Sequence, residues 1–421
     1  MATGNEAAGA VRPLSAIAIA VVVTLGTLYI VSQFLRNSVG VIAPNLAEEM
    51  GLSPIEIGLL SSIYFLAFAA TQIPLGIALD RYGPKTCMLV CVGFTVLGCA
   101  LFALAQSAGG LVAARAILGF GTASFLMAPV ALYARWFPPE RFSTFAGIQL
   151  GLGSLGALFA TAPLALATAS FGWRATFLGV GACAAVIGAV MWLLVTDDPP
   201  GARSAPRPRE TFRESVAGIW EVIRTPSVGR VFMAQLSSYP TYILVAGLWG
   251  GPYLTHIYGY DLKGRGDILF LAAFTQMMAS FFWGPCDRWF GSHRTPVLIG
   301  LGMCLTSLLL LAGLGTLPIP LLLVVFAMVG LATGQSSVLM AHGRSLVAPH
   351  LLGRTITLLN MGAMGGSFLV QFISGAIIDL FPRQGDAYPL EAYRLVFGLQ
   401  AVLVLTGLLT YFRSRDKHLA S

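Results

Sequence analysis

Charged residues are scarce in this chain, and their scarcity restricts what the protein can be. Only 10% of the 421 residues are Asp, Glu, Lys or Arg, whereas 56% are apolar. A soluble domain carries about 25% charged and about 45–50% apolar residues. The composition therefore excludes a water-soluble enzyme, a disordered protein and a secreted disulfide scaffold. It indicates helices packed in lipid.

Cysteine is also sparse, and its spacing offers no site. None of the six cysteines shows the CxxC spacing of a metal or redox centre, and all fall in apolar runs. We interpret them as small buried apolar residues. The sequence thus predicts neither a metal nor a cofactor.

Apolar runs long enough to cross a bilayer recur between charged or Pro/Gly breaks. A transmembrane helix needs about 20 mostly apolar residues, and a backbone in lipid must satisfy its own hydrogen bonds. We therefore predict an all-α membrane protein with twelve transmembrane helices. The predicted spans are 14–41, 56–79, 86–106, 110–134, 143–170, 174–195, 229–257, 267–290, 296–316, 319–345, 354–380 and 393–413.

The positions of the basic residues predict the orientation of the chain. Most of the 25 Lys and Arg residues fall in the breaks on the side of the two termini. Basic loops stay in the cytoplasm, so both termini are expected there, with the protein in the plasma membrane, the inner membrane of a bacterium. The net charge of +7 then reflects the basic residues of the cytoplasmic loops, which set the orientation. It does not indicate a nucleic-acid partner.

The chain divides into two similar halves. The longest hydrophilic break, 196–228, separates a predicted six-helix bundle in 1–195 from another in 229–421. Apolar residues at helical spacing within this linker predict an amphipathic helix on the membrane surface. Asp80-Arg81 in the first half is repeated as Asp287-Arg288 in the second. We predict two pseudo-symmetric bundles, an arrangement that suits alternating access.

Two motifs carry a family resemblance. The stretch from Gly76 to Lys85, with Asp80-Arg81 at its centre, resembles the loop signature of the major facilitator superfamily, and Arg115-Ala-Ile-Leu-Gly119 resembles that family's fourth-span motif. The resemblance implies secondary transport. It implies a gating role for Asp80, Arg81 and Lys85, with Asp287 and Arg288 as the second copy, and a coupling role for Arg115.

Charge inside a span is expensive unless it is functional, and only Arg36 and Arg115 lie within spans. A guanidinium that faces a cavity without a fixed carboxylate would hold an anion. The stretch Leu35–Pro44 resembles the first span of organophosphate:phosphate antiporters and anion:cation symporters, and this implies that Arg36 contacts an anionic substrate. Ile243 stands where phosphate-ester carriers have a second Arg, so a mono-anion or zwitterion fits better.

No Asp or Glu lies mid-span; Asp267 and Asp379 lie near span ends. Both a proton symporter with a carboxylate in its cavity and an exporter of cationic drugs are therefore disfavoured. His256 and His342 also lie at span ends, where a surface role is expected. Further candidate substrate contacts, each of which could equally join two helices, are Gln33, Tyr29, Tyr64, Gln72, Gln149, Gln235, Tyr239, Tyr242, Asn360 and Gln371.

We therefore predict a symporter or antiporter for a small organic anion or zwitterion, with Arg36 as the leading ligand residue. A carrier of neutral solutes or short peptides, or a drug-type exporter, remains the alternative, with Arg36 structural. The expected partners are a small solute, a proton or counter-anion, and the lipid bilayer. We expect a monomer and no enzymatic activity, because no His/Asp/Glu cluster shares one face.

Overall fold

The computed structural model describes residues 16–198, 217, 220–225, 227–348, 351–384 and 387–414, and these ranges are helical with no strand. The predicted all-α class is confirmed. The helices are α1 (Ala16–Asn37), α2 (Val39–Met50), α3 (Pro54–Tyr82), α4 (Pro84–Leu104), α5 (Ala108–Thr122), α6 (Ser124–Trp136), α7 (Pro139–Phe159), α8 (Ala162–Leu194), α10 (Val228–Leu244), the π-helical turn η1 (Val245–Trp249), α11 (Gly250–Tyr258), α12 (Leu262–Trp283), α13 (Cys286–Trp289), α14 (Arg294–Gly313), α15 (Ile319–Ala332), α16 (Gln335–Ser345), α17 (Leu352–Asp379) and α18 (Leu390–Phe412).

The number of membrane-crossing helices agrees with the sequence. Within the described ranges, eleven helices are long and apolar enough to span a bilayer, and a shorter apolar stretch, Thr144–Phe159, supplies the remaining predicted span. The predicted boundary at 143–170 was wrong. α7 ends at Phe159, Thr161 leaves helical geometry, and α8 begins at Ala162 with Pro163 in its first turn. Proline is tolerated there because its missing N–H would have no partner.

Several predicted spans are interrupted near the middle of the molecule. The first divides into α1 and α2 at Ser38, and the seventh divides into α10, η1 and α11. Pro240 lies inside α10 and cannot donate a backbone hydrogen bond, which loosens the helix one turn before the π-helical turn. These breaks place interruptions of the α-helical hydrogen-bond pattern close to Arg36 and its neighbours.

Local sequence fixes the start of α3 firmly. The Oγ of Ser53 accepts from the backbone N–H of Glu56 at 3.4 Å, and Glu56 Oε2 accepts from the N–H of Ser53 at 2.8 Å. This reciprocal capping box satisfies two otherwise free donors at the helix start. The helix therefore begins at a defined residue beside the contact between the two halves.

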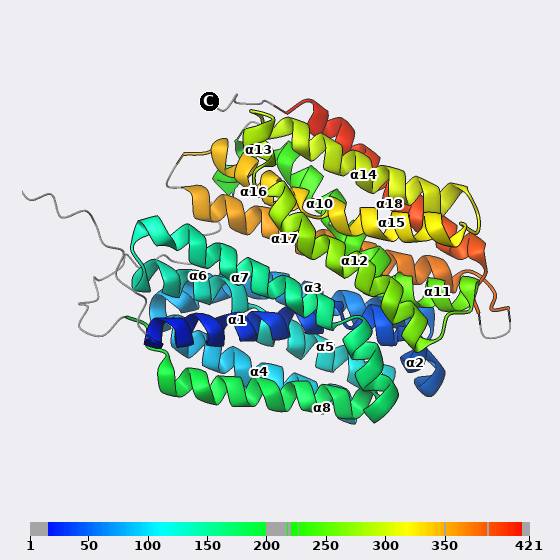
Figure 1. The fold of residues 1–421 in the computed structure, drawn as a ribbon, viewed down its shortest axis with the longest axis horizontal. Helices are drawn as coiled ribbons and strands as arrows, with labels where there is room; N and C mark the ends of the chain where they lie inside the picture. The colour runs from blue at the N-terminus through cyan, green and yellow to red at the C-terminus, as the bar shows by residue number, and fades with distance from the viewer. Residues whose placement is uncertain are drawn as a thin grey trace, which may run out of the picture.

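The helices form two groups, α1–α8 and α10–α18, which lie one above the other in Figure 1. Contacts between the groups run mainly along α3 and α17, between α12 and the pair α7 and α8, and between α2 and α11. At the end of the molecule where α2 meets α11, Gly251 packs on the carbonyl of Gly40 with no room for a methyl group, and Gly58 also packs closely on Gly375. Small residues thus bring the two groups into backbone contact at this end.

The amphipathic helix predicted within 196–228 lies mostly outside the described residues. Trp220 to Arg224 are helical, with Trp220 and Ile223 exposed. Val222 is buried in a small cluster with Val228 and Leu358. This short segment therefore presents one apolar face to the α10–α18 group.

Candidate functional site

Arg36 lies near the end of α1, at the interface between the two groups. Its side chain is buried, with 6% of its surface exposed. Nη1 donates to the hydroxyl of Tyr239 on α10 at 3.2 Å, and the guanidinium carbon lies 4.7 Å from the centre of the Phe68 ring. Within the described part of the chain, no ion pair to a carboxylate forms at this guanidinium. The cation is thus held by a phenol and an aromatic face alone.

Polar atoms near Arg36 also have unused hydrogen-bonding capacity. The Nε of Arg36 is buried without a partner, as are Oε1 of Gln33 and Oδ1 of Asn37 on the same helix. The side chain of Tyr29, two turns earlier on the same helix, is buried as well, with 6% of its surface exposed. A buried donor or acceptor left unpaired costs about 1–3 kcal/mol, so this group of atoms is suited to a polar ligand.

Arg115, the second intramembrane arginine, is bound quite differently. It is fully buried, and its Nη1 and Nε donate to the backbone carbonyls of Leu35 at 2.6 Å and Leu60 at 3.3 Å. Its guanidinium carbon lies 4.6 Å from the centre of the Tyr64 ring. Tyr64 in turn shares a 2.5 Å hydrogen bond with Thr122. Arg115 therefore joins α1, α3 and α5 inside one group. One of its acceptors, the carbonyl of Leu35, belongs to the residue that precedes Arg36.

Two glutamines of the first group make local contacts. Gln149 uses its whole amide: Nε2 donates to the carbonyls of Leu25 and Phe125, and Oε1 accepts from Tyr133. Gln72 donates only within α3, to the carbonyl of Phe68 at 3.4 Å. Gln149 thus connects helices, and Gln72 lies one turn along from the ring that covers Arg36.

The candidates of the second group are less fully bonded. Gln235 donates to Ser336 at 2.7 Å and Gln371 donates to the carbonyl of Ile243 at 3.4 Å, and the Oε1 atom of each amide is buried without a partner. Tyr242 is buried at 2% exposure, and Asn360 is half-buried. Among the candidates of the second group, Tyr239 contacts Arg36 directly.

A third buried arginine, Arg265, was missed at the sequence level, where it counted as a loop residue. It is 3% exposed at the start of α12. Nε donates to the carbonyl of Val41 at 2.9 Å, Nη1 to Thr255 Oγ1 at 3.0 Å, and Nη2 to the side chain of Asn45. Two of these bonds cross from one group to the other. We call Arg265 with Val41, Asn45, Gly40 and Gly251 the latch.

The α2 side of the latch is fixed to its own group by Glu49. Its carboxylate accepts from the indole N–H of Trp173 at 2.6 Å and from Arg174, both on α8. The hydrogen bond from Trp173, and then that from Arg174, lower the pKa of Glu49 below its ordinary value. α2 is therefore anchored to α8 while Arg265 holds it from the opposite group.

The predicted gating residues lie at the other end of the helices. Asp80 and Arg81 are exposed at the end of α3. Lys85 lies at the start of α4, where its backbone N–H donates to Asp197 at 2.7 Å and its Nζ to the carbonyl of Trp192 at 2.8 Å. The loop motif is thus bound to the end of α8.

The second copy of the loop motif is arranged differently. Asp287 accepts from the N–H of Arg288 at 2.8 Å and lies 3.7 Å from Nδ1 of His293. Arg288 is exposed. The expected surface role for His342 was wrong, because this side chain is fully buried and shares a 2.7 Å hydrogen bond with Tyr411. His256 similarly bonds Tyr393 at 2.6 Å.

Comparison with known proteins assigns this architecture to a family. The family model described as Major Facilitator Superfamily matches residues 25–264 and 231–421. The chain is 27% identical over 187 residues to "Nitrate/nitrite transporter NrtP" of Picosynechococcus sp., covering 38% of this chain and 35% of that protein. It is 24% identical over 253 residues to "Galacturonate transporter" of Dickeya chrysanthemi, covering 57% and 72%.

A solved structure agrees in fold. A bacterial homolog of the human lysosomal transporter Spinster, in an inward-facing and unoccupied conformation, superposes with a TM-score of 0.73 at 17% identity, over 95% of this chain and 97% of that one. The matched stretch spans about a third of the length of the first curated relatives. The chain belongs to the major facilitator superfamily, a family of membrane transporters and not of enzymes.

Proposed function

We propose that this protein is a secondary transporter of a small organic anion, and that Arg36 binds the anionic group. One observation carries the proposal: the guanidinium of Arg36 is buried between the two groups with no carboxylate partner among the described residues. An unpaired charge inside a membrane protein is expensive and marks a functional site. A carboxylate on the solute would supply the missing partner.

The surroundings favour a ligand with one negative charge and further polar groups. Arg36 is one cation, and Ile243 lies buried on α10 where a second would be needed for a phosphate ester. Gln33 and Asn37 offer buried acceptor atoms without donors. Hydroxyl or ammonium groups on the same solute could donate to them, so a hydroxylated monocarboxylate or a zwitterion is suited to this site.

The names of the relatives support an anionic cargo. One is named for nitrate and nitrite, and the other for galacturonate, all of which are anions. Of these, galacturonate combines a single carboxylate with several hydroxyl groups. It is therefore the first solute to test.

Transport would proceed by alternating access between the α1–α8 bundle and the α10–α18 bundle, joined by the linker 196–228. In this conformation the latch holds the two bundles together at the α2 end. We infer that the opposite end, which carries Asp80 and Arg81, is the one open to the solute. With both termini cytoplasmic, the molecule would face inward in a bacterial inner membrane.

Proton coupling, if present, would not use a carboxylate at Arg36. Of the described acids, Glu49 pairs with Arg174 away from this site, Asp80 lies at the exposed end of α3, and Asp287 lies in the short helix α13. Exchange against a second anion would need no titratable group. A counter-anion is therefore the coupling partner that the charge distribution favours over a proton.

Counterflow in proteoliposomes tests the proposal. Vesicles loaded with unlabelled galacturonate should accumulate labelled galacturonate, with and without a pH gradient, while vesicles loaded with neutral galactose should not accumulate labelled galactose. Arg36→Lys, which keeps the charge, is the matched control for Arg36→Gln. Equal counterflow of galactose or a dipeptide would instead favour the neutral-solute carrier, and a cationic drug as sole cargo would favour an exporter.

A further inference from the structure

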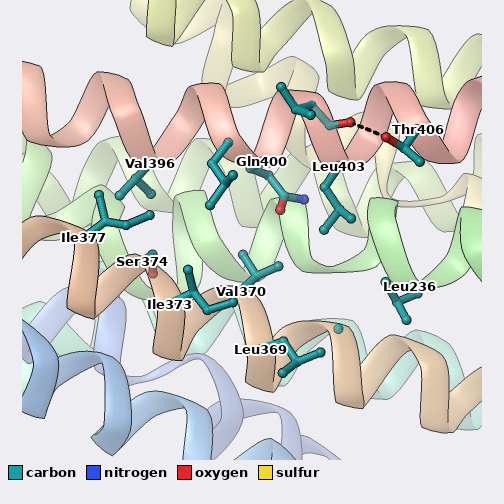
Figure 2. A pocket seen from close by; sticks show the side chains of 13 residues that line it. Leu236, Leu369, Val370, Ile373, Ser374, Ile377, Val396, Gln400, Leu403 and Thr406 are labelled. Atoms are coloured by element: carbon teal, nitrogen blue, oxygen red, sulfur yellow. Dashed lines mark hydrogen bonds between the residues drawn. The ribbon is translucent and has the colours of Figure 1, made fainter.

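A groove opens on the side of the second bundle between α17 and α18, with α10 at its floor (Figure 2). It has a volume of about 310 Å³, at the lower end of the range of ligand pockets. Leu369, Ile373 and Val402 stand at its rim with roughly half of their surface exposed. Because these side chains belong to membrane-spanning helices, the groove opens towards the hydrocarbon of the bilayer.

One polar side chain, Gln400, lies among these apolar walls. It is 2% exposed, and Figure 2 shows its carboxamide between α18 and α17, near Val370 and Leu403. Its Nε2 donates to the carbonyl of Ser237 at 2.8 Å and to Thr241 Oγ1 at 3.1 Å. A carbonyl can only accept, so the nitrogen must face Ser237 and the amide cannot be flipped. The oxygen of Gln400 therefore points away from α10.

That oxygen, Oε1 of Gln400, is buried and has no hydrogen-bond partner. The other polar groups of the groove already use their protons: Ser374 donates to the carbonyl of Gln371 and Thr406 to that of Val402. Ser374 also accepts from Trp249. A buried water molecule needs two to four polar partners, and besides Gln400 the polar side chains that line the groove are Ser374 and Thr406. The groove is thus mainly apolar, and Oε1 of Gln400 is a buried acceptor in it that has no donor. Such a groove is matched by an apolar molecule with one donor.

We propose that the groove is a binding site for a lipophilic alcohol, that is, a hydrocarbon body whose single hydroxyl donates to Oε1 of Gln400. The hydrocarbon would lie against Leu369, Ile373 and Val396, and the hydroxyl would satisfy the buried acceptor. A phospholipid acyl chain can fill the same space but has no donor for Gln400. The hydroxyl therefore distinguishes a selective site from an ordinary lipid crevice.

Photolabelling of the intact protein in liposomes tests the site directly. The probes are an octanol that carries a diazirine and the matching diazirine octane without the hydroxyl, with adducts located by mass spectrometry. The alcohol should label the groove about tenfold more than the alkane, as expected for one buried hydrogen bond, and excess octanol should compete. Equal labelling by both probes would overturn the proposal and leave only a lipid crevice.

Variants of Ile373 and Gln400 distinguish the apolar space of the groove from its hydrogen-bond acceptor. Ile373→Trp fills the space while leaving Gln400 unsubstituted and should abolish groove labelling, whereas Leu405→Trp, on the same α18 face towards lipid but outside the groove, should not. Gln400→Leu should keep labelling by the alkane and lose the preference for the alcohol. A preference that survives Gln400→Leu, or labelling that survives Ile373→Trp, would contradict the site. Since the readout is labelling, failure of the transport proposal would not affect it.

Discussion

Arg36 and Arg115 are both buried arginines that pair with no carboxylate among the residues the structure describes, yet their surroundings differ in kind. Arg115 donates to two backbone carbonyls of its own bundle, so its charge is solvated by fixed dipoles. Arg36 has a single hydrogen-bond partner, Tyr239, which belongs to the other bundle, and its Nε is unpaired. Nη2 of Arg115 is also buried without a partner, so an unused donor alone does not separate the two arginines. The difference lies in what holds each cation: Arg115 is bound by backbone carbonyls of its own bundle, whereas Arg36 is bound by a side chain of the other bundle.

The largest expected effect is that of Arg36→Gln on anion affinity. Removing one partner of a buried charge pair costs about 2–5 kcal/mol, so galacturonate affinity should fall by about thirtyfold or more. Folding should be unaffected, because Arg36 makes no bond to backbone in this structure. Isothermal titration with galacturonate, together with a melting curve, measures both. A lower melting temperature with unchanged affinity would assign Arg36 the role we give to Arg115.

Arg115→Gln should produce the reverse pattern. The carbonyls of Leu35 and Leu60 would lose their donors inside the bundle, so stability should fall by about 3 kcal/mol. In the fraction that folds, the affinity for galacturonate should change less than it does in Arg36→Gln. Thermal unfolding in detergent checks the first statement. Intact stability with lost transport would point instead to the coupling role that the family resemblance implies.

The latch offers a test of the interface in which Arg36 lies. In Gly251→Ala the new methyl group meets the carbonyl of Gly40, and overpacking of this kind costs about 1–3 kcal/mol in this conformation alone. The population should shift towards states with α2 and α11 apart. Spin labels at Glu48→Cys and Lys263→Cys, with the exposed Cys183 replaced by Ser, should report a longer distance. Gly109→Ala, in α5 outside the latch, serves as the control, because a methyl group there meets no atom and the backbone φ is not positive.

Tyr239→Phe should sharpen the assignment of Arg36 with a smaller effect. It removes the hydroxyl that accepts from Nη1 and keeps the ring. One hydrogen bond to a charged group contributes about 1.5–3 kcal/mol, but an anion bound at Arg36 can take over the freed donor. Galacturonate affinity should therefore change less than tenfold, in either direction. A loss as large as that of Arg36→Gln would show that Tyr239 itself binds the solute.

The smallest effect is expected from Glu49. Because its pKa is lowered, its interactions with Trp173 and Arg174 contribute stability above the ordinary pKa of a carboxyl and lose it only as the pH falls through the lowered value. Between pH 5.5 and 7.5 the group stays ionised. Glu49→Gln should thus leave the pH profile of transport unchanged in this window. A shifted profile would make Glu49 a candidate for proton coupling.

Much of the fold could be predicted from the sequence because lipid imposes a simple rule. Long apolar runs must be helices there, and the repeat of Asp80-Arg81 in Asp287-Arg288 indicated two similar halves. The sequence could not place the end of α7 at Phe159, because no charged residue marks it. Arg265 escaped notice because its partner, the carbonyl of Val41, lies 224 residues away and backbone carbonyls carry no signal in a sequence.

The candidate site was only partly predictable for the same reason. The rarity of charge in the spans led to Arg36 and Arg115, but their difference depends on which carbonyls each can reach. Gln149 resembled a substrate contact by type and position, yet its amide is used between helices. Polar residue type identifies candidates in a membrane helix, and the hydrogen-bond partners decide among them.

The central claim is that Arg36 selects the cargo by its charge, and one ratio measures it. The affinity for galacturonate divided by that for galactose compares two sugars that differ in one carboxylate. In the unaltered protein this ratio should be large, and in Arg36→Gln it should fall to about one, with Arg36→Lys between them. A ratio that stays large in Arg36→Gln would contradict the account and move anion recognition elsewhere in the chain.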